Sequence, residues 1–319
     1  MRIVFMGTPE FSVPALECIH EAGHEIVGVV TQPDKPRGRG GAVTYTPVKE
    51  KALCLSLPVY QPRRVRAEEF LDVIRELNPD VIVVIAFGQI LPQALLDIPR
   101  YGCINIHASL LPAYRGAAPI QWAVINGEKE TGVTIMQMDA GLDTGDMLKK
   151  QTVLVEPGET GGSLHDKLMK IGGPLLLEVL EEIGAGTAVP VPQTGESTYA
   201  SMLDKAMGDV DWLKSAEEIE RLIRGLNPWP SAYTQWKGKT LKLWQAEIMR
   251  ETAGDEKGRA EAAPGTVVSL DEGICVRTGE GILRITQLQL EGKKRMDAAA
   301  FLRGAHVTVG DTLKQKDCS

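Results

Sequence analysis

An asparagine and a histidine two positions apart, Asn105 and His107, lie in an apolar run that leads into a Ser-Leu-Leu-Pro segment. In a β-strand, residues i and i+2 point to the same side, so the two polar side chains can face one space while Ile104 and Ile106 pack behind them. An amide donor beside an imidazole can hold a carbonyl oxygen as it gains charge, and histidine can also move a proton near neutral pH. The pair therefore predicts acyl-transfer chemistry.

Three carboxylates follow among glycines in the segment D-A-G-L-D-T-G-D, residues 139–146, where the glycines allow the backbone to turn sharply. Asp143 lies midway between two predicted strands, Thr131 to Met138 and Met147 to Val155. We expect this carboxylate to be the one that reaches His107, although spacing alone does not decide it. A solvated turn or a calcium loop are the alternatives, but the positions do not match the EF-hand pattern of oxygen ligands ending in glutamate.

Composition and charge describe an ordinary globular protein. The 319 residues are 43% hydrophobic and 24% charged, with a net charge of −7, and this length is typical of about two domains. A net acidic chain is unsuited to indiscriminate nucleic-acid binding, but local basic clusters can still contact a polyanion. Two such clusters are Lys35 to Arg39 and Lys293 to Arg295, and a solvated surface loop is the alternative interpretation of each.

The N-terminus has no charged leader followed by a long apolar region, and no run reaches the roughly 18 apolar residues of a membrane span. We therefore expect a cytoplasmic protein. The five cysteines are scattered without a C-x-x-C pair, which is typical of reduced thiols. His20, His24, His165 and His306 lack metal-ligand spacing, so no metal is expected.

The first half alternates apolar runs with helical patterns, which predicts an α/β fold with a Rossmann-like parallel sheet covered by helices. The elements expected are Ile3 to Met6, Ser12 to Ala22, Glu25 to Thr31, Ala67 to Leu77 and Val81 to Ile85. The turn after the first run lacks G-x-G-x-x-G, which disfavours a nicotinamide cofactor. Ligands of open α/β sheets bind beyond the carboxyl ends of the strands, so we expect the site where His107 and residues 86–91 emerge.

A helix is expected at about 162–182, followed by a Gly- and Pro-rich stretch typical of a linker. We predict a catalytic domain over 1–188, a linker over 189–204 and a C-terminal domain over 205–319. Ser215 with Glu218 predicts a capping box on a helix that runs to Gly225. Five apolar runs with glycine turns then predict a small OB-like β-barrel: Ala232 to Trp236, Thr240 to Ile248, Gly265 to Leu270, Gly273 to Thr278 and Ile282 to Leu290.

Several motifs resemble those of the methionyl-tRNA formyltransferase family, one of the folate-dependent formyltransferases, over nearly the whole chain. They are G-T-P-E-F-S at 7–12, T-Q-P-D-K-P-R-G-R-G at 31–40, C-I-N-I-H-A-S-L-L-P-A-Y-R-G-A-A-P-I-Q at 103–121, E-T-G-V-T-I-M-Q-M-D-A-G-L-D-T-G-D-M-L at 130–148 and N-P-W-P at 227–230. The resemblance implies that a formyl group passes from 10-formyltetrahydrofolate to the α-amino group of methionine on initiator tRNA, for translation initiation.

The resemblance also assigns residues. Asn105, His107 and Asp143 resemble the catalytic triad of these enzymes, in agreement with the argument from strand geometry. The folate-binding segments that it implies are Ser109, Leu110, Leu111 and Pro112, together with Phe87, Gly88, Gln89, Ile90 and Leu91. Backbone groups at strand ends suit a pterin, which needs paired donors and acceptors in a shallow slot.

The loop over residues 34–46 resembles the tRNA-contacting insertion of the family, with Arg37 and Arg39 matching its basic residues. Val43, Thr44 and Tyr45 replace a more basic stretch that is common in that loop, which predicts weaker phosphate contacts here. A monomer is expected.

Two other functions stay open from the sequence. A related enzyme could formylate a small amine, such as a sugar nucleotide or glycinamide ribonucleotide, although a small substrate would not require the basic loop and the barrel. A non-catalytic RNA-binding protein on the same fold is the second alternative, against which the intact Asn105, His107 and Asp143 argue.

Overall fold

The computed structural model describes residues 1–37, 42–249 and 262–315. Contacts between Cα atoms divide the chain into two compact units. The N-terminal unit comprises Met1–Pro119, Glu130–Leu154 and His165–Ala200, and the C-terminal unit comprises Ile120–Lys129, Val155–Leu164 and Ser201–Ser319. The domain boundaries at residues 188 and 205 stay a prediction.

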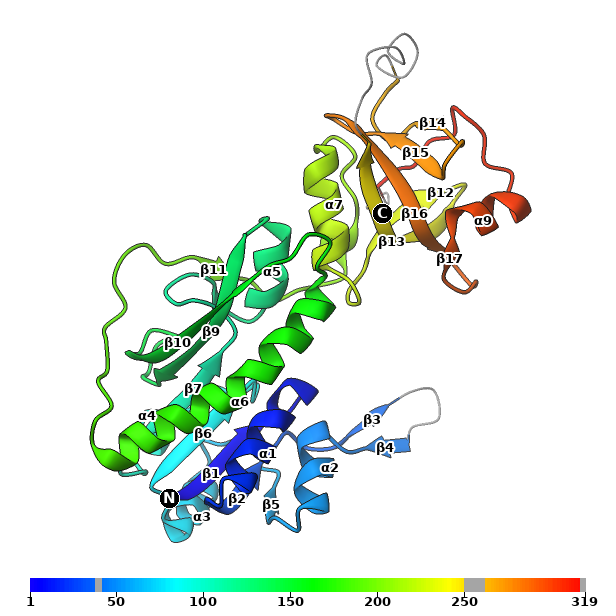
Figure 1. The fold of residues 1–319 in the computed structure, drawn as a ribbon. Helices are drawn as coiled ribbons and strands as arrows, with labels where there is room; N and C mark the ends of the chain where they lie inside the picture. The colour runs from blue at the N-terminus through cyan, green and yellow to red at the C-terminus, as the bar shows by residue number, and fades with distance from the viewer. Residues whose placement is uncertain (38–41, 250–261, 316–319) are drawn as a thin grey trace. The chain divides into compact units, whose positions relative to one another are not determined.

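A seven-stranded sheet in the order β10-β9-β7-β6-β1-β2-β5 forms the centre of the N-terminal unit (Figure 1). Its strands are β1 (Arg2–Gly7), β2 (Glu25–Val30), β5 (Val59–Tyr60), β6 (Val81–Ile85), β7 (Cys103–His107), β9 (Glu130–Gln137) and β10 (Met147–Leu154). The five strands from β5 to β7 run parallel, which confirms the predicted parallel-sheet α/β fold. β9 is antiparallel to both β7 and β10, so β9 and β10 form a hairpin at one edge of the sheet.

Helices cover both faces of the sheet because its central strands carry apolar residues on both sides. All five residues of β6 are buried. One face packs against α3 (Glu68–Leu77) and α4 (Gln93–Leu96) through a cluster that includes Ile82, Phe70 and Leu95. On the other face, α6 (Gly161–Ala185) lies against Ile106 of β7 through Gly172, and against α1 (Val13–Glu21) through Gly173. α2 (Pro47–Cys54) follows a short hairpin of β3 (Lys35–Arg37) and β4 (Ala42–Thr44).

The C-terminal unit holds a curled antiparallel sheet in the order β12-β13-β16-β15-β14, as the sequence predicts. Its strands are β12 (Ala232–Trp236), β13 (Lys239–Met249), β14 (Val267–Ser269), β15 (Ile274–Arg277) and β16 (Ile282–Leu290), with β17 (Met296–Asp297) paired to β16. The other helices are α5 (Pro119–Ile125), α7 (Ala216–Gly225) and α9 (Ala298–Gly304). α7 begins at the predicted capping box, in which Ser215 and Glu218 exchange hydrogen bonds with each other's backbone amides.

The edge strands of this sheet, β12 and β14, are bridged by a segment near the end of the described chain. The amide of Gln235 donates to the carbonyl of Lys314 at 2.8 Å, and the amide of Val267 donates to the carbonyl of Asp311 at 2.8 Å. Residues 311–314 thereby close the sheet into a barrel-like ring, which covers backbone edges that would otherwise be open. In the described parts of the chain, no helix is both long and apolar enough to cross a membrane.

Candidate active site

The two predicted polar residues lie on one side of β7, at the carboxyl end of the parallel strands. Asn105 is half-buried and pairs with Val84 of β6 and Met136 of β9, while His107 is 6% exposed and ends the strand. Both side chains leave the strand on the face opposite Ile106. The structure therefore brings Asn105 and His107 to one site, as the i, i+2 spacing predicts.

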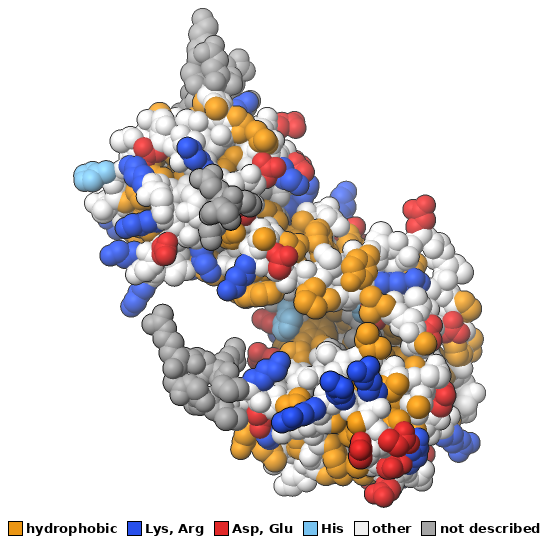
Figure 2. All heavy atoms as spheres, turned by 180° about the vertical axis from the view of Figure 1, so that it is seen from behind, with side chains coloured by type: hydrophobic (Ala, Val, Ile, Leu, Met, Phe, Trp, Pro, Cys, Tyr) orange, Lys and Arg blue, Asp and Glu red, His pale blue; other side chains and the backbone are white. Residues whose placement is uncertain are grey.

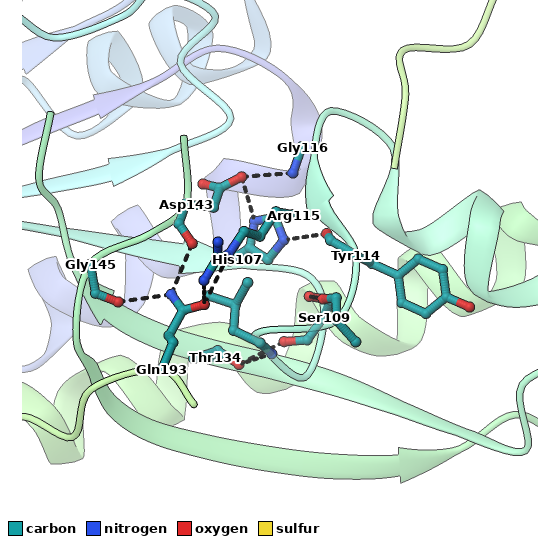
Figure 3. Close-up of polar contacts among 11 residues, drawn as sticks. His107, Ser109, Tyr114, Arg115, Gly116, Thr134, Asp143, Gly145 and Gln193 are labelled. Carbon is teal, nitrogen blue, oxygen red and sulfur yellow. Dashed lines mark hydrogen bonds and ion pairs between the residues drawn. The ribbon is translucent and has the colours of Figure 1, made fainter. Parts of the chain in front are cut away.

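Asp143 reaches the same place from the loop between β9 and β10 (Figure 3). Its Oδ2 atom lies 3.6 Å from Nδ1 of His107 and accepts a hydrogen bond from the amide of Gly116 at 2.8 Å. The other imidazole nitrogen, Nε2, lies 2.8 Å from the carbonyl oxygen of Tyr114. The histidine is thus held between a backbone acceptor on one side and a carboxylate on the other.

The loop that carries Asp143 must turn back along β7 to make this contact. The strands on either side of the loop pair through Met136 and Met147, and Met136 lies opposite Asn105 of β7. The loop therefore begins at a level of the sheet two residues before His107. Asp143 has a φ of 52°, in the left-handed region that non-glycine residues seldom adopt, although aspartate tolerates it better than most. Gly145 passes so close to the chain that a Cβ there would lie 1.8 Å from the Gln137 carbonyl oxygen.

The Ser-Leu-Leu-Pro segment forms a tight turn whose own groups are engaged within the chain. The Ser109 hydroxyl donates to the Ala113 carbonyl at 2.6 Å, and the Thr134 hydroxyl donates to the Ser109 carbonyl at 2.7 Å while accepting from the Leu111 amide. The Leu111 carbonyl accepts from Lys150, whose pKa is lowered by partial burial. Ser109 and Leu111 are fully buried, which leaves Leu110 and Pro112 as the half-buried side chains of the turn.

The second predicted folate segment follows β6 directly. Phe87 is buried, and its carbonyl accepts hydrogen bonds from Thr8 and Gln32. Within residues 1–37, 42–249 and 262–315, the amides of residues 88–91 donate no hydrogen bond to the chain, and the buried Nε2 of Gln89 has no partner. Ile90 is 88% exposed, whereas Leu91 is buried. Unused donors beside one exposed aliphatic side chain fit a flat polar heterocycle such as a pterin.

Of the two arginines predicted to contact tRNA, Arg37 ends β3 and its backbone pairs with Ala42. Arg39 lies outside the described residues. A further aromatic and basic group lies on the C-terminal unit, where Trp244 has the guanidinium of Arg295 5.0 Å and the ammonium of Lys242 5.6 Å from its ring. Lys and Arg side chains gather on the face of that unit drawn in Figure 2.

Three groups in the site were not singled out from the sequence: the Tyr114 carbonyl, the Gly116 amide and the side chain of Gln193. The first two are backbone groups, which carry no residue-type signal. Gly116 has a φ of 113°, a conformation that glycine favours, but the sequence does not show that the chain turns there. Gln193 lies in the segment predicted as a linker, where a single glutamine is unremarkable.

Other reactive groups are accounted for by packing. Burial, with a smaller contribution from Asp97, raises the pKa of the Cys103 thiol to about 12, so this residue stays protonated and inert. In the part of the chain that the structure describes, no cluster of three or more His, Cys, Asp or Glu residues is arranged to hold a metal ion.

Family models identify the class of protein that this fold and site define. Residues 1–180 match the formyl transferase family, and residues 202–306 match the formyl transferase C-terminal domain. The sugar 3N-formyl transferase WlaRD, solved in the presence of dTDP and 5-N-formyl-THF, has a similar fold with a TM-score of 0.68, at 19% identity over 92% of this chain and 99% of that one. HypX from Aquifex aeolicus in complex with tetrahydrofolic acid gives a TM-score of 0.63, at 20% identity over 99% of this chain and 51% of that one. The molecule is a two-domain formyl transferase.

Relatives with high sequence identity identify one family within the formyl transferases. The methionyl-tRNA formyltransferase of Agathobacter rectalis is 55% identical over 97% of this chain and 98% of its own length. That of Lachnospira eligens is 53% identical over 98% and 99%, respectively. The chain belongs to the methionyl-tRNA formyltransferase family.

Proposed function

We propose that the protein transfers the formyl group of 10-formyltetrahydrofolate to the α-amino group of methionine on initiator tRNA, giving the formylmethionyl-tRNA used in translation initiation. It would act in the cytoplasm as a monomer, without a metal. The observation that carries this proposal is the contact of Asp143 with His107, beside Asn105 at the end of β7, in a chain of this family.

Folate, when bound, supplies the activated formyl group. The residues after β6, Phe87 to Leu91, would hold the pterin through their unused donors, and the turn Ser109 to Pro112 would form the opposite wall. As the methionine amine attacks the formyl carbon, the Asn105 amide would stabilise the oxygen that gains charge. His107, supported by the Asp143 carboxylate, would help to move the proton of the attacking amine. The bond from the formyl carbon to N10 then breaks, N10 takes up a proton, and tetrahydrofolate leaves.

Recognition of tRNA would involve both units. Arg37 and Arg39 belong to a loop whose stem is anchored, because Asp34 pairs with Lys49 and accepts a hydrogen bond from Gln61 at 2.8 Å. On the C-terminal unit, the group formed by Trp244, Lys242 and Arg295 combines a π-face with two cations, which suits contact with RNA.

The test mixes the purified protein with 10-formyltetrahydrofolate and one acceptor at a time: methionyl initiator tRNA, glycinamide ribonucleotide or an amino-sugar nucleotide. We expect formylmethionine to appear only with the tRNA. Arg39→Ala should weaken tRNA use while leaving folate binding unchanged, and should lower the salt dependence of tRNA binding by about one unit of slope. Faster transfer to a small amine would overturn the proposal.

A further inference from the structure

Gln193 is exceptional in the segment that joins the two family-model matches. From Val189 to Tyr199, every residue is exposed except Gln193, which is half-buried. Its side chain points into the site beside the Asp143 loop and Arg115 (Figure 3). A half-buried polar side chain in an otherwise exposed segment loses part of its contact with water, so the groups that it packs against must supply hydrogen bonds in its place.

Four hydrogen bonds satisfy the Gln193 amide. Its Nε2 donates to the carbonyl of Asp143 and to the carbonyl of Gly145, both at 2.8 Å. Its Oε1 accepts from Nε and Nη2 of Arg115, at 3.0 and 2.7 Å. Carbonyls only accept and a guanidinium only donates, so the amide fits in one orientation alone.

These bonds act on the loop that carries Asp143. The Asp143 loop holds itself through Asp139, which accepts from the Gly141 amide at 3.0 Å and the Thr144 hydroxyl at 2.7 Å. Neither bond reaches Asp143, whose backbone is in the left-handed region. Gln193 donates hydrogen bonds to the carbonyls of Asp143 and Gly145, on either side of Thr144. These bonds fix the direction in which the Asp143 carboxylate leaves the loop.

The segment around Gln193 is itself tied to both partners of the catalytic contact. On one side, Val191 and Met147 exchange backbone hydrogen bonds at 2.8 Å, at the point where the Asp143 loop rejoins β10. On the other side, β11 (Tyr199–Ala200) pairs in parallel with β8 (Arg115–Gly116), and Thr198 accepts from the Tyr114 amide at 2.8 Å. Tyr114 and Gly116 are the residues whose backbone holds His107 and Asp143.

We propose that Gln193, oriented by Arg115, is a positioning residue of the formyl transfer reaction that sets the Asp143 carboxylate against His107. The predicted linker would then help to position the catalytic groups. Its first half holds the Asp143 loop, and its second half pairs with β8, next to the Tyr114 carbonyl that contacts the histidine. This inference rests on the proposed roles of His107 and Asp143.

The test compares Gln193→Glu, Gln193→Ala and the control Glu196→Gln, which changes an exposed side chain of the same segment. Glutamate has the shape of glutamine and keeps the acceptor for Arg115, but it offers no donor to the two loop carbonyls. Two measurements are made: steady-state kinetics with 10-formyltetrahydrofolate and methionyl initiator tRNA, and amide hydrogen exchange of the peptide over residues 138–147.

We expect both Gln193 variants to lose about 10- to 100-fold in kcat, because displacing a reacting group by about 1 Å costs roughly that much. KM for each substrate should change less than threefold, the pH profile of kcat should shift, and exchange over 138–147 should rise. Glu196→Gln should match the wild type in each respect.

Kinetics within twofold of the wild type for Gln193→Glu would overturn the proposal, even if exchange rises, because the loop position would then be irrelevant to the rate. Unchanged exchange would overturn it too, since no clamp would exist. A wild-type protein that formylates none of the acceptors would instead refute the proposed function, and the exchange measurement alone would then decide whether the clamp exists.

Discussion

The Nε2 atom of His107 lies 2.8 Å from the carbonyl oxygen of Tyr114. A carbonyl cannot donate, so Nε2 carries a proton whether the imidazole is neutral or charged. In the proposed mechanism, the nitrogen that is free to gain and lose a proton is therefore Nδ1, which faces Asp143 at 3.6 Å. The chain supplies this arrangement by turning back after the Ser-Leu-Leu-Pro segment, which brings a backbone acceptor to a histidine seven residues earlier.

Replacing His107 by alanine should lower kcat by about 10²- to 10³-fold, because it removes a group that stabilises developing charge rather than one that fills the core. Steady-state formylation assays measure the loss, and circular dichroism checks that the fold is retained. His165→Ala is the matched control, since His165 lies on α6 and contacts Asp166 and Phe11 outside the site. More than half of wild-type turnover in His107→Ala would exclude this histidine from catalysis.

Asp143→Asn keeps a side-chain oxygen for the Gly116 amide but removes the charge that faces Nδ1 of His107. We expect kcat to fall by at least tenfold and the acidic limb of the pH–rate profile to flatten, because the neutral amide no longer places a negative charge beside the imidazole. Asp139→Asn, in the same loop, should leave the shape of that profile unchanged. If the profile of Asp143→Asn overlays that of the wild type, another carboxylate supports the histidine.

Gly116→Ala tests how closely the strand that holds Asp143 is packed. A Cβ at Gly116 would lie 2.6 Å from the Ala200 carbonyl, and the residue has a φ of 113°. Gly186→Ala is the control, because Gly186 has a φ of 70° with nothing within 4 Å of an added Cβ. Both changes should cost about 1 kcal/mol in backbone strain. Only Gly116→Ala should also lower kcat, and equal kinetics of the two variants would show that the β8–β11 pairing does not bear on the site.

The Asp311 carboxylate predicts a pH-dependent contribution to the stability of the C-terminal unit. Burial opposes its ionisation, but hydrogen bonds from Trp236, Lys237 and Thr308 outweigh burial and lower its pKa from 3.8 to about 2. Because the pKa of Asp311 is lower in the folded state than in the unfolded state, its ionised form stabilises the folded protein at pH values above about 3.8. This contribution disappears as the pH falls from about 3.8 to about 2. Asp311→Asn should therefore be less stable than the wild type at pH 7, with a gap that narrows below pH 4. Urea unfolding at pH 7, 5, 4 and 3 measures the gap, and a constant difference would contradict the argument.

Local signals in the sequence were enough for much of the architecture. The run Val81 to Ile85 is a strand with the predicted bounds, since five adjacent apolar residues suit a position buried on both faces. The capping box at Ser215 was equally readable, because both of its partners lie within one helical turn. The same holds for Asn105 and His107, whose shared face follows from strand alternation.

What could not be predicted depends on pairings between distant segments. The antiparallel direction of β9 relative to β7 is not encoded in its apolar pattern, which suits either direction. Gln193 lies 50 positions after Asp143, in a segment whose Gly and Pro content indicates a linker, and no local rule relates the two. Residues 311–314 lack a strand-like alternation, and they bridge β12 and β14 only because the curled sheet brings those two edges near one another.

The late position of that bridge has a consequence for biosynthesis. A nascent chain can complete the N-terminal unit once Ala200 has left the ribosome, but the ring of the C-terminal unit must wait for Lys314. Until then, β12 and β14 present unpaired backbone to neighbouring chains, which is a route to aggregation. Ribosome stalling just before the codons of residues 311–314 should therefore be more harmful to the yield of folded protein than an equal delay between the two units.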